Sequence, residues 1–319
     1  MSILPNSRSP AKLLVVFVLL LATWAVLTKV DQGPVAAKAT PALPAPKSPL
    51  SVFHLGHSLV GRDMPAMLQQ LAGPGHRYDV QLGWGTPLKA HWEPDIEING
   101  FAQENAHERY RDAKEALQSG DYDVFVATEM VEIRDAIEYH ASAEYLQRWA
   151  TLARAANPDI RIYLYETWPR TDDAEGWLQR LDRDLSRYWQ EKILRPAQNR
   201  AETAAPIYLI PAGQTLAAFV RALESAGGID NIADRYGLFT KDADGIRDNV
   251  HLNDLGIYLV ALTHYAVLTH QSPVGLPRQL LRADGSKAIA PGENAARLMQ
   301  EIVWQVVTSL PETGVPQRK

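Results

Sequence analysis

The chain has 319 residues, of which 46% are hydrophobic and 22% are charged, a composition typical of globular proteins. Its formal net charge of -5 at pH 7 gives no basic excess of the kind that binds nucleic acid, so we expect no nucleic-acid partner. The sequence contains no cysteine, which excludes disulfides, thiolate metal ligands, a cysteine nucleophile and a lipid anchor on cysteine.

The N-terminus carries an apolar run, LLVVFVLLLATWAVLT, at residues 13–28, preceded by Arg8 and Lys12 and followed by Lys29. Roughly 20 apolar residues cross a bilayer, and positive charge before the run predicts that the rest of the chain is exported. We expect residues 1–30 to be a signal anchor that holds the following domain in the periplasm at the inner membrane. A cleaved signal peptide, which would release a secreted protein, is the alternative.

The remaining chain divides into three parts. Residues 31–49 are rich in proline and alanine and predict an extended linker. We expect the main domain at residues 50–312 and a C-terminal tail at residues 313–319.

Within the main domain, short apolar runs alternate with longer amphipathic stretches. The runs are almost continuously apolar, as expected for parallel strands that are buried on both faces. We expect strands at 50–56, 78–83, 122–128, 160–166 and 205–212. We expect helices near 62–72, 103–119, 141–156, 173–199, 213–226, 254–270 and 293–309. This alternation predicts a three-layer α/β/α sandwich with a mainly parallel, flavodoxin-like sheet of five strands.

Polar residues at the strand ends are candidates for a site, because ligands bind beyond the carboxyl ends of the strands in such sheets. The first strand ends in Gly56-His57-Ser58-Leu59. Ser58 alone fits an ordinary turn after a strand. A role as nucleophile requires a histidine and a carboxylate from elsewhere in the chain.

Asp248 and His251 supply such a pair on the loop that leads into the helix near 254–270, for which Asn253 is the expected N-cap. A general base needs one imidazole nitrogen facing the nucleophile and the other held by an acceptor. On a compact turn, Asp248 can hold one nitrogen of His251 while the other nitrogen faces Ser58. The three residues therefore form a candidate catalytic triad.

The Gly-x-Ser-x-Gly elbow of α/β-hydrolases does not fit, because Val60 stands at the second glycine position. The pattern instead resembles the SGNH (GDSL-like) hydrolase superfamily. Its first block, Gly-x-Ser-Leu, is similar to Gly56–Leu59, and its last block, Asp-x-x-His, is similar to Asp248–His251. The glycine of its second block is similar to Gly85 in GWGTPLKAHW. The resemblance covers roughly residues 50–270.

One block departs from the family pattern. After the third strand the family has Gly-x-Asn-Asp, whose asparagine donates to the oxyanion, whereas residues 127–130 here are Ala-Thr-Glu-Met. A glutamate donates no hydrogen bond unless it is protonated. The resemblance therefore implies a divergent branch with three alternatives. The backbone amides of Ser58 and Gly85 form the oxyanion hole alone, Thr128 contributes, or Glu129 does another job: it positions His251, binds a substrate hydroxyl or stays protonated through burial.

Two further side chains are candidates for substrate binding. His91 follows the second strand and can line the mouth of the site, and Trp168 follows the fourth strand and offers a flat face for a sugar ring. Each also fits a structural role, His91 near the start of a helix and Trp168 as a core anchor. The sequence has no His-Glu-x-x-His spacing and no nucleotide-binding glycine motif, so we expect neither a metal nor a cofactor.

The resemblance implies an extracytoplasmic serine esterase whose nucleophile is Ser58, whose base is His251 and whose orienting carboxylate is Asp248. It suggests small acyl esters as substrates, in particular O-acetyl groups on carbohydrate. Three alternatives stay open. They are an acyltransferase to glycan on the same triad, a non-catalytic glycan-binding or assembly protein, and a lipase that acts at the membrane.

Overall fold

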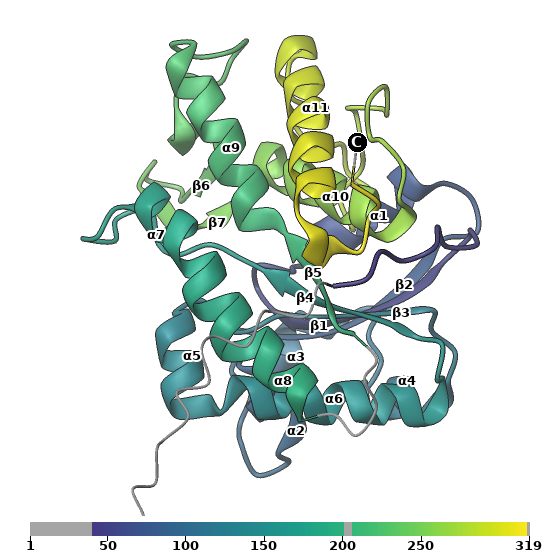
Figure 1. Cartoon of the computed structure of the whole chain (residues 1–319). Helices are drawn as coiled ribbons and strands as arrows, with labels where there is room; N and C mark the ends of the chain where they lie inside the picture. The colour runs from purple at the N-terminus through teal and green to yellow at the C-terminus, as the bar shows by residue number, and fades with distance from the viewer. Residues whose placement is uncertain (1–39, 201–205, 318–319) are drawn as a thin grey trace, which may run out of the picture. The chain divides into compact units, whose positions relative to one another are not determined.

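The computed structural model describes residues 40–200 and 206–317 (Figure 1). The predicted N-terminal segment 1–30 and the first part of the predicted linker lie outside the described residues. Across the two described ranges, no helix combines the length and the apolar character that a membrane span needs.

Five strands form one parallel sheet in the order β2-β1-β3-β4-β5, which crosses the middle of the molecule (Figure 1). The strands are β1 (Ser51–His57), β2 (Arg77–Gly83), β3 (Val124–Ala127), β4 (Arg161–Glu166) and β5 (Tyr208–Pro211). This order is that of flavodoxin-like folds. The predicted three-layer sandwich with a five-stranded parallel sheet is therefore confirmed.

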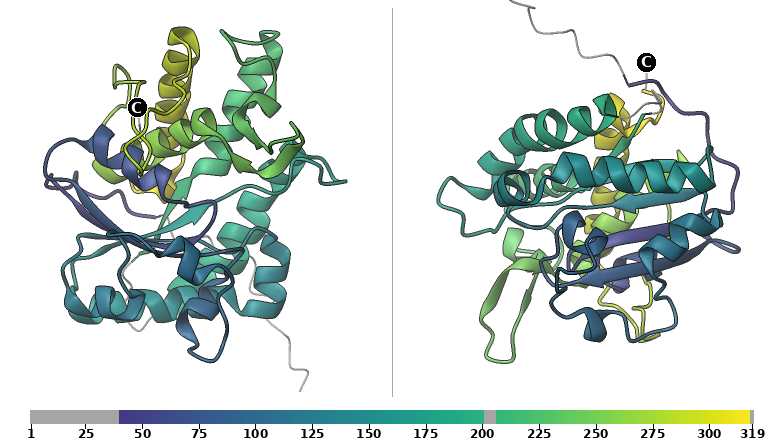
Figure 2. Two further views of the ribbon diagram at one scale, coloured as in Figure 1. Left: turned by 180° about the vertical axis from the view of Figure 1, so that it is seen from behind. Right: turned by 90° about the horizontal axis from the view of Figure 1, so that it is seen from below.

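Two layers of helices cover the two faces of the sheet (Figures 1 and 2). One layer contains α1 (Asp63–Ala72), α9 (Ala212–Ser225), α10 (Asp254–Thr269) and α11 (Glu293–Ser309). The other contains α4 (Ala113–Ser119), α6 (Ser142–Ala156), a π-helical segment (Leu185–Leu194) and α8 (Arg195–Asn199). The other α-helices are α2 (Leu88–Trp92), α3 (Phe101–Glu104), α5 (Ile133–His140) and α7 (Trp177–Asp184).

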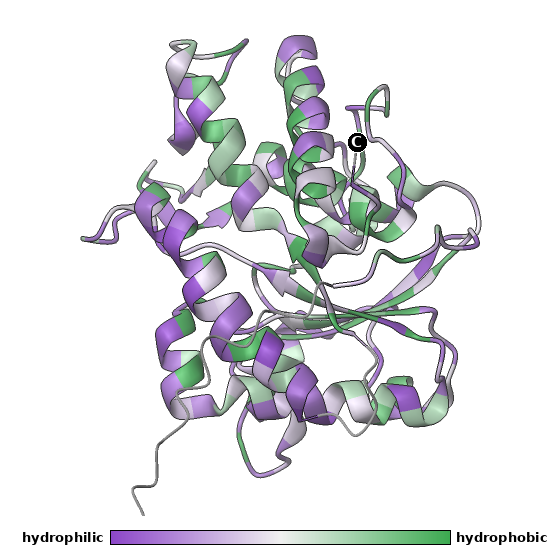
Figure 3. Ribbon diagram, viewed as in Figure 1, coloured by the Kyte–Doolittle hydropathy of each residue, from purple (hydrophilic) through white to green (hydrophobic). Residues whose placement is uncertain are grey.

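Side-chain alternation along the strands builds two separate cores. Val52 packs into the core under α10, whereas Phe53 packs into the core over α6, because successive residues of a strand point to opposite faces. Figure 3 shows apolar residues concentrated in the strands, with hydrophilic residues along the outer helix surfaces. Every residue of α10 except Ile257 is buried, so this helix forms the centre of its layer.

The expected helix at 103–119 is wrong, because it is interrupted between α3 and α4. The side chain of Asn105 accepts from the Leu82 amide at 3.0 Å and donates to the Leu82 carbonyl at 2.8 Å. The carboxylate of Asp112 then caps α4 by accepting from two amides of its first turn. Asn105 thus bonds to β2 where α3 ends, and Asp112 satisfies free amides where α4 begins, so the two side chains end one helix and begin the next.

The segment before α10 also differs from the expected loop. Residues Arg247–Leu252 form strand β7, which pairs with β6 (Phe239–Lys241) in a small antiparallel sheet. Asn253 caps α10 as predicted, with its side-chain oxygen 2.9 Å from the Leu255 amide. Asp248 and His251 therefore lie on a strand whose end is fixed by the start of a buried helix.

Burial lowers the pKa of eight histidines, moderately for His107 and His140 and strongly for the six others. Burial lowers the pKa to about 4 for His57, His76, His91, His264 and His270, and well below the usual range for His54. Burial removes the hydration of the charged imidazolium, so the neutral ring is favoured. Among the described residues, neither nitrogen of His54 has a hydrogen-bond partner.

We expect the free energy of unfolding to fall as the pH drops from about 6.5 to about 4. Unfolded histidines bind protons below about pH 6.5, whereas the buried rings do so only near pH 4, so the unfolded state takes up more protons and acid favours it. Denaturant titrations across this window measure the loss. His54→Phe removes one such group and should lose less stability than the wild type; an equal loss would contradict this account.

Candidate active site

Ser58 opens the turn that follows β1, at the carboxyl edge of the sheet. A Cβ atom at Gly56 would lie 2.6 Å from Thr128 Cγ2 and 2.9 Å from Val60 Cγ2. The end of β1 and the loop after β3 therefore approach too closely for any side chain at this position. The turn closes with a hydrogen bond of 2.8 Å from the Val60 amide to the His57 carbonyl, and this geometry presents Ser58 at its tip.

The structure brings Ser58, His251 and Asp248 together although 193 positions separate the serine from the histidine. The Nε2 atom of His251 lies 2.9 Å from Ser58 Oγ, and its Nδ1 atom lies 2.7 Å from Asp248 Oδ2. Because an ionised carboxylate only accepts, Nδ1 carries the proton and Nε2 is free to accept from the serine hydroxyl. This is the arrangement that a general base requires.

Asp248 is fixed by the backbone on its other oxygen. Oδ1 accepts from the amides of Val250 at 2.7 Å and His251 at 2.8 Å. Burial by itself would raise the pKa of Asp248, but the hydrogen bonds from the His251 amide, the His251 ring and the Val250 amide outweigh it and lower the pKa below its usual value. The carboxylate is therefore ionised at neutral pH and can stabilise a charged His251.

Ser58 and His251 line a pocket of about 210 Å³. Trp168 forms part of its wall, but this indole is only 2% exposed and donates from Nε1 to the Val250 carbonyl at 2.8 Å. The prediction that Trp168 lies near the site is supported by this position. The prediction that Trp168 offers an open face for a sugar ring is wrong, because the ring is buried and its indole nitrogen bonds to β7.

The predicted oxyanion donors lie on two loops that leave the same edge of the sheet. His57 pairs with Gly83 in the register of β1 and β2, so Ser58 and Gly85 follow neighbouring strand ends. Gly85 has a φ of 56°, a left-handed conformation that favours glycine. Within the described residues, neither of the two amides donates a hydrogen bond to another group, so both are available to a ligand oxygen.

Three other predicted residues are not placed at the pocket. The buried hydroxyl of Thr128 donates to the Tyr165 carbonyl at 2.8 Å. His91 donates from Nε2 to the Gly56 carbonyl at 2.9 Å and accepts at Nδ1 from the Gln81 side chain. Glu129 is fully buried, with one carboxyl oxygen 3.2 Å from the Met130 amide. Their expected contacts with substrate are corrected to structural roles, because their polar atoms face the protein interior.

His57 was assigned no role in the sequence, but its ring joins two strand ends behind the nucleophile. Its Nε2 atom donates to the Glu129 carbonyl at 2.6 Å, and its Nδ1 atom accepts from the Leu59 amide at 3.3 Å. Burial lowers its pKa to about 4, so the ring is neutral and can accept at Nδ1. In the sequence, the only signal for this structural role of His57 was its position next to Ser58.

An exposed indole beside the pocket was also missed. The side chain of Trp84 is 50% exposed, and its Nε1 atom donates to Glu104 Oε1 at 2.7 Å. Glu104 itself lines the pocket of Ser58. A Cβ atom at Gly100 would lie 2.2 Å from Trp84 Cδ2, so the ring packs directly on a glycine backbone. One face of the indole is thereby held, and half of its surface remains open to solvent.

No group of three or more metal-ligating side chains gathers in the part of the chain that the structure describes. No protein-family model and no curated protein matches the chain.

Solved structures give the fold. A DUF4886 family protein from Bacteroides uniformis matches at a TM-score of 0.51 and 16% identity, over 81% of this chain and 94% of that chain. A carbohydrate esterase family 3 protein from Talaromyces cellulolyticus gives 0.33 and 15%, over 69% and 97% of the two chains. An acetyl esterase mutant with acetate ion gives 0.32 and 15% over the same shares. At 16% identity the first similarity concerns the fold alone, and the other two, with TM-scores of 0.33 and 0.32, carry no argument.

We expect Glu129→Gln to remove a source of alkaline destabilisation. Burial raises the pKa of Glu129 to about 8, whereas an unfolded glutamate releases its proton near pH 4.3. The folded state therefore holds a proton that the unfolded state has lost, and stability declines as the pH rises towards 8. Glutamine does not ionise. The variant should therefore lose less stability than the wild type between about pH 5 and pH 8, by on the order of a few kcal/mol.

Denaturant titrations at both ends of this pH range provide the measurement. Glu138→Gln, on the exposed side of α5, is the matched control and should follow the wild type. If Glu129→Gln also follows the wild type, the buried carboxyl is not protonated in the folded protein.

Proposed function

We propose that this protein is a serine esterase that removes small acyl groups, in particular O-acetyl groups, from carbohydrate. The observation that carries the proposal is the continuous hydrogen-bond chain from Ser58 through His251 to Asp248, at 2.9 and 2.7 Å. These three residues lie at the carboxyl edge of a parallel sheet, where folds of this class place their ligands. A serine is a weak nucleophile without such a base.

The geometry supports a two-step mechanism. Ser58 Oγ attacks the ester carbonyl carbon while His251 Nε2 takes the hydroxyl proton, and Asp248 stabilises the imidazolium. The tetrahedral oxyanion accepts from the amides of Ser58 and Gly85. Its collapse expels the alcohol, which receives the proton from His251, and leaves an acyl group on Ser58. Water then attacks this ester with His251 as base, which releases the acid and restores the serine.

Two features support the choice of substrate. The pocket of about 210 Å³ at Ser58 suits a short acyl group better than a long chain. The half-exposed ring of Trp84 beside it offers an apolar face of the kind on which a sugar ring packs. The apolar segment at residues 13–28 supports a location outside the cytoplasm, on an inner-membrane anchor or as a secreted protein.

The full-length protein should hydrolyse nitrophenyl acetate, and Ser58→Ala or His251→Ala should lower kcat by roughly 10⁴-fold, because both remove the activated nucleophile. The double variant should be no slower than either single one, since the two residues act as a unit. Ser186→Ala, at an exposed serine, should keep the wild-type rate. Equal rates in the wild type and both triad variants would rule out the esterase.

Trp84→Ala should raise KM for acetylated monosaccharides by about threefold to tenfold, which corresponds to the loss of one aromatic packing contact. The effect on nitrophenyl acetate should be smaller, since that ester carries no sugar ring. Trp84→Phe keeps an aromatic face and should recover part of the affinity. If both variants change the two substrates to the same extent, Trp84 acts on the fold of the loop and not on the sugar.

A further inference from the structure

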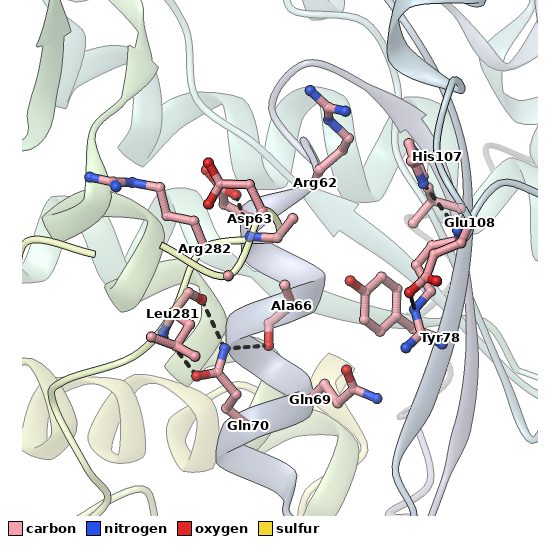
Figure 4. Close-up of a pocket in the computed structure, with 15 residues that line it drawn as sticks. Arg62, Asp63, Ala66, Gln69, Gln70, Tyr78, His107, Glu108, Leu281 and Arg282 are labelled. Carbon is pink, nitrogen blue, oxygen red and sulfur yellow. Dashed lines mark hydrogen bonds and ion pairs between the residues drawn. The ribbon is translucent and has the colours of Figure 1, made fainter. Parts of the chain in front are cut away.

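A hollow of about 610 Å³ adjoins the pocket of Ser58 (Figure 4). Both are lined by Arg62 and Asp63, which stand at the start of α1 directly after the nucleophile turn. Typical ligand sites have volumes of roughly 300–1,000 Å³. The hollow falls within this range, whereas the 210 Å³ of the Ser58 pocket falls below it. The space for most of a substrate therefore lies outside the Ser58 pocket.

One wall of the hollow is fixed to α1 by the chain itself. Gln70 donates to the Leu281 carbonyl and accepts from the Leu281 amide, both at 2.8 Å (Figure 4). Two residues further on, the Ala283 amide donates to Asp63 Oδ1 at 2.9 Å. The loop at 281–285 is thus held in place without a ligand, as expected of a largely pre-formed site.

The lining of the hollow combines charges of both signs. Arg62 forms no ion pair with another described residue, and the ion pair of Arg109 is a long one, 3.7 Å to the exposed Glu108. Asp63 and Glu108 supply acceptors on the same surface. A long acyl chain needs an apolar lining, and an anionic ligand needs a positive excess. Hydroxyl groups, which both donate and accept, match this surface.

A second hollow, of about 820 Å³, adjoins the Ser58 pocket through Asp63, Leu252 and Ile257. The two hollows share Asp63 and Arg282 with each other, so all three spaces meet at Asp63. A ligand larger than a small ester can extend from the Ser58 pocket into either hollow.

We propose that the hollow of Figure 4 binds a further sugar residue of an oligosaccharide, adjacent to the residue whose acyl group enters the Ser58 pocket. The inference rests on the proposed esterase function and extends it from small sugar esters to acylated glycan chains. The sugar hydroxyls pair with Arg62, Arg109 and Glu108. The loop at residues 281–285 restricts the direction in which the rest of the glycan extends from the hollow.

The test compares full-length wild type with Gln69→Trp and Glu108→Trp, two variants that place an indole in the hollow. Probes are nitrophenyl acetate, nitrophenyl octanoate and a panel of O-acetylated sugars of increasing length, built from glucose, xylose or N-acetylglucosamine. The wild-type kcat/KM should rise by about tenfold from the monosaccharide to longer members of at least one series. Both indole variants should lose this rise. Gln305→Trp, at an exposed glutamine of α11, should keep it.

The outcomes are distinguishable. If no series shows a rise with length, or if both indole variants keep it, the hollow does not bind sugar and the inference is wrong while the esterase stands. If the indole variants instead lower octanoate turnover selectively, the hollow binds an acyl chain, which also overturns the inference. If wild type and Ser58→Ala hydrolyse nitrophenyl acetate equally, the proposed function fails and the inference falls with it. Glu108 makes no short bond in the fold, so Glu108→Trp remains informative if Gln69→Trp is unstable.

Discussion

The Asp248 carboxylate is the group on which the geometry of the site depends. One oxygen is bound by two backbone amides at the end of β7, and the other is bound by the ring of His251. The same carboxylate therefore shapes the backbone and aims the imidazole. Without the backbone contacts the ring would be free to turn about its side-chain torsions, and Ser58 would lose a base at a fixed distance. The strand that carries both residues is held in turn by Trp168 and by the cap of α10.

The serine depends on a second constraint, the close contact between the ends of β1 and β3. Gly56 allows the contact, and His57 bridges it by bonding to the Glu129 carbonyl and the Leu59 amide. These groups are buried and neutral, so the hydrogen bonds of His57 require no desolvation of a charged group. The turn after β1 and strand β7 are therefore positioned by separate sets of contacts. Both must be correctly placed for the 2.9 Å distance between Ser58 and His251.

The sequence predicted the parts of the structure that local pattern determines. Continuous apolar runs identified the buried strands, and Asn253 identified the start of α10, because these signals act over a few residues. Asp248 was assigned to a loop instead of β7, since a short strand in a two-stranded sheet has no periodicity of its own. The sequence did not identify Trp84, because the position of its ring depends on packing against Gly100. The two residues are 16 positions apart, and no local pattern connects them. The same limit explains why Glu129 was expected near substrate although its carboxyl points into the core.

Glu129 stands where the resembled family has an oxyanion donor, and its inward orientation has a consequence for the substrate. Loss of one such donor typically costs about 10²- to 10³-fold in rate, and Thr128 and Glu129, which follow β3, are both fully buried. Contacts remote from the reacting bond can offset such a loss when they orient the substrate for attack. The two hollows that adjoin the Ser58 pocket offer surface for contacts of this kind. The extended substrate site that we propose would therefore complement an oxyanion hole formed by the Ser58 and Gly85 amides alone.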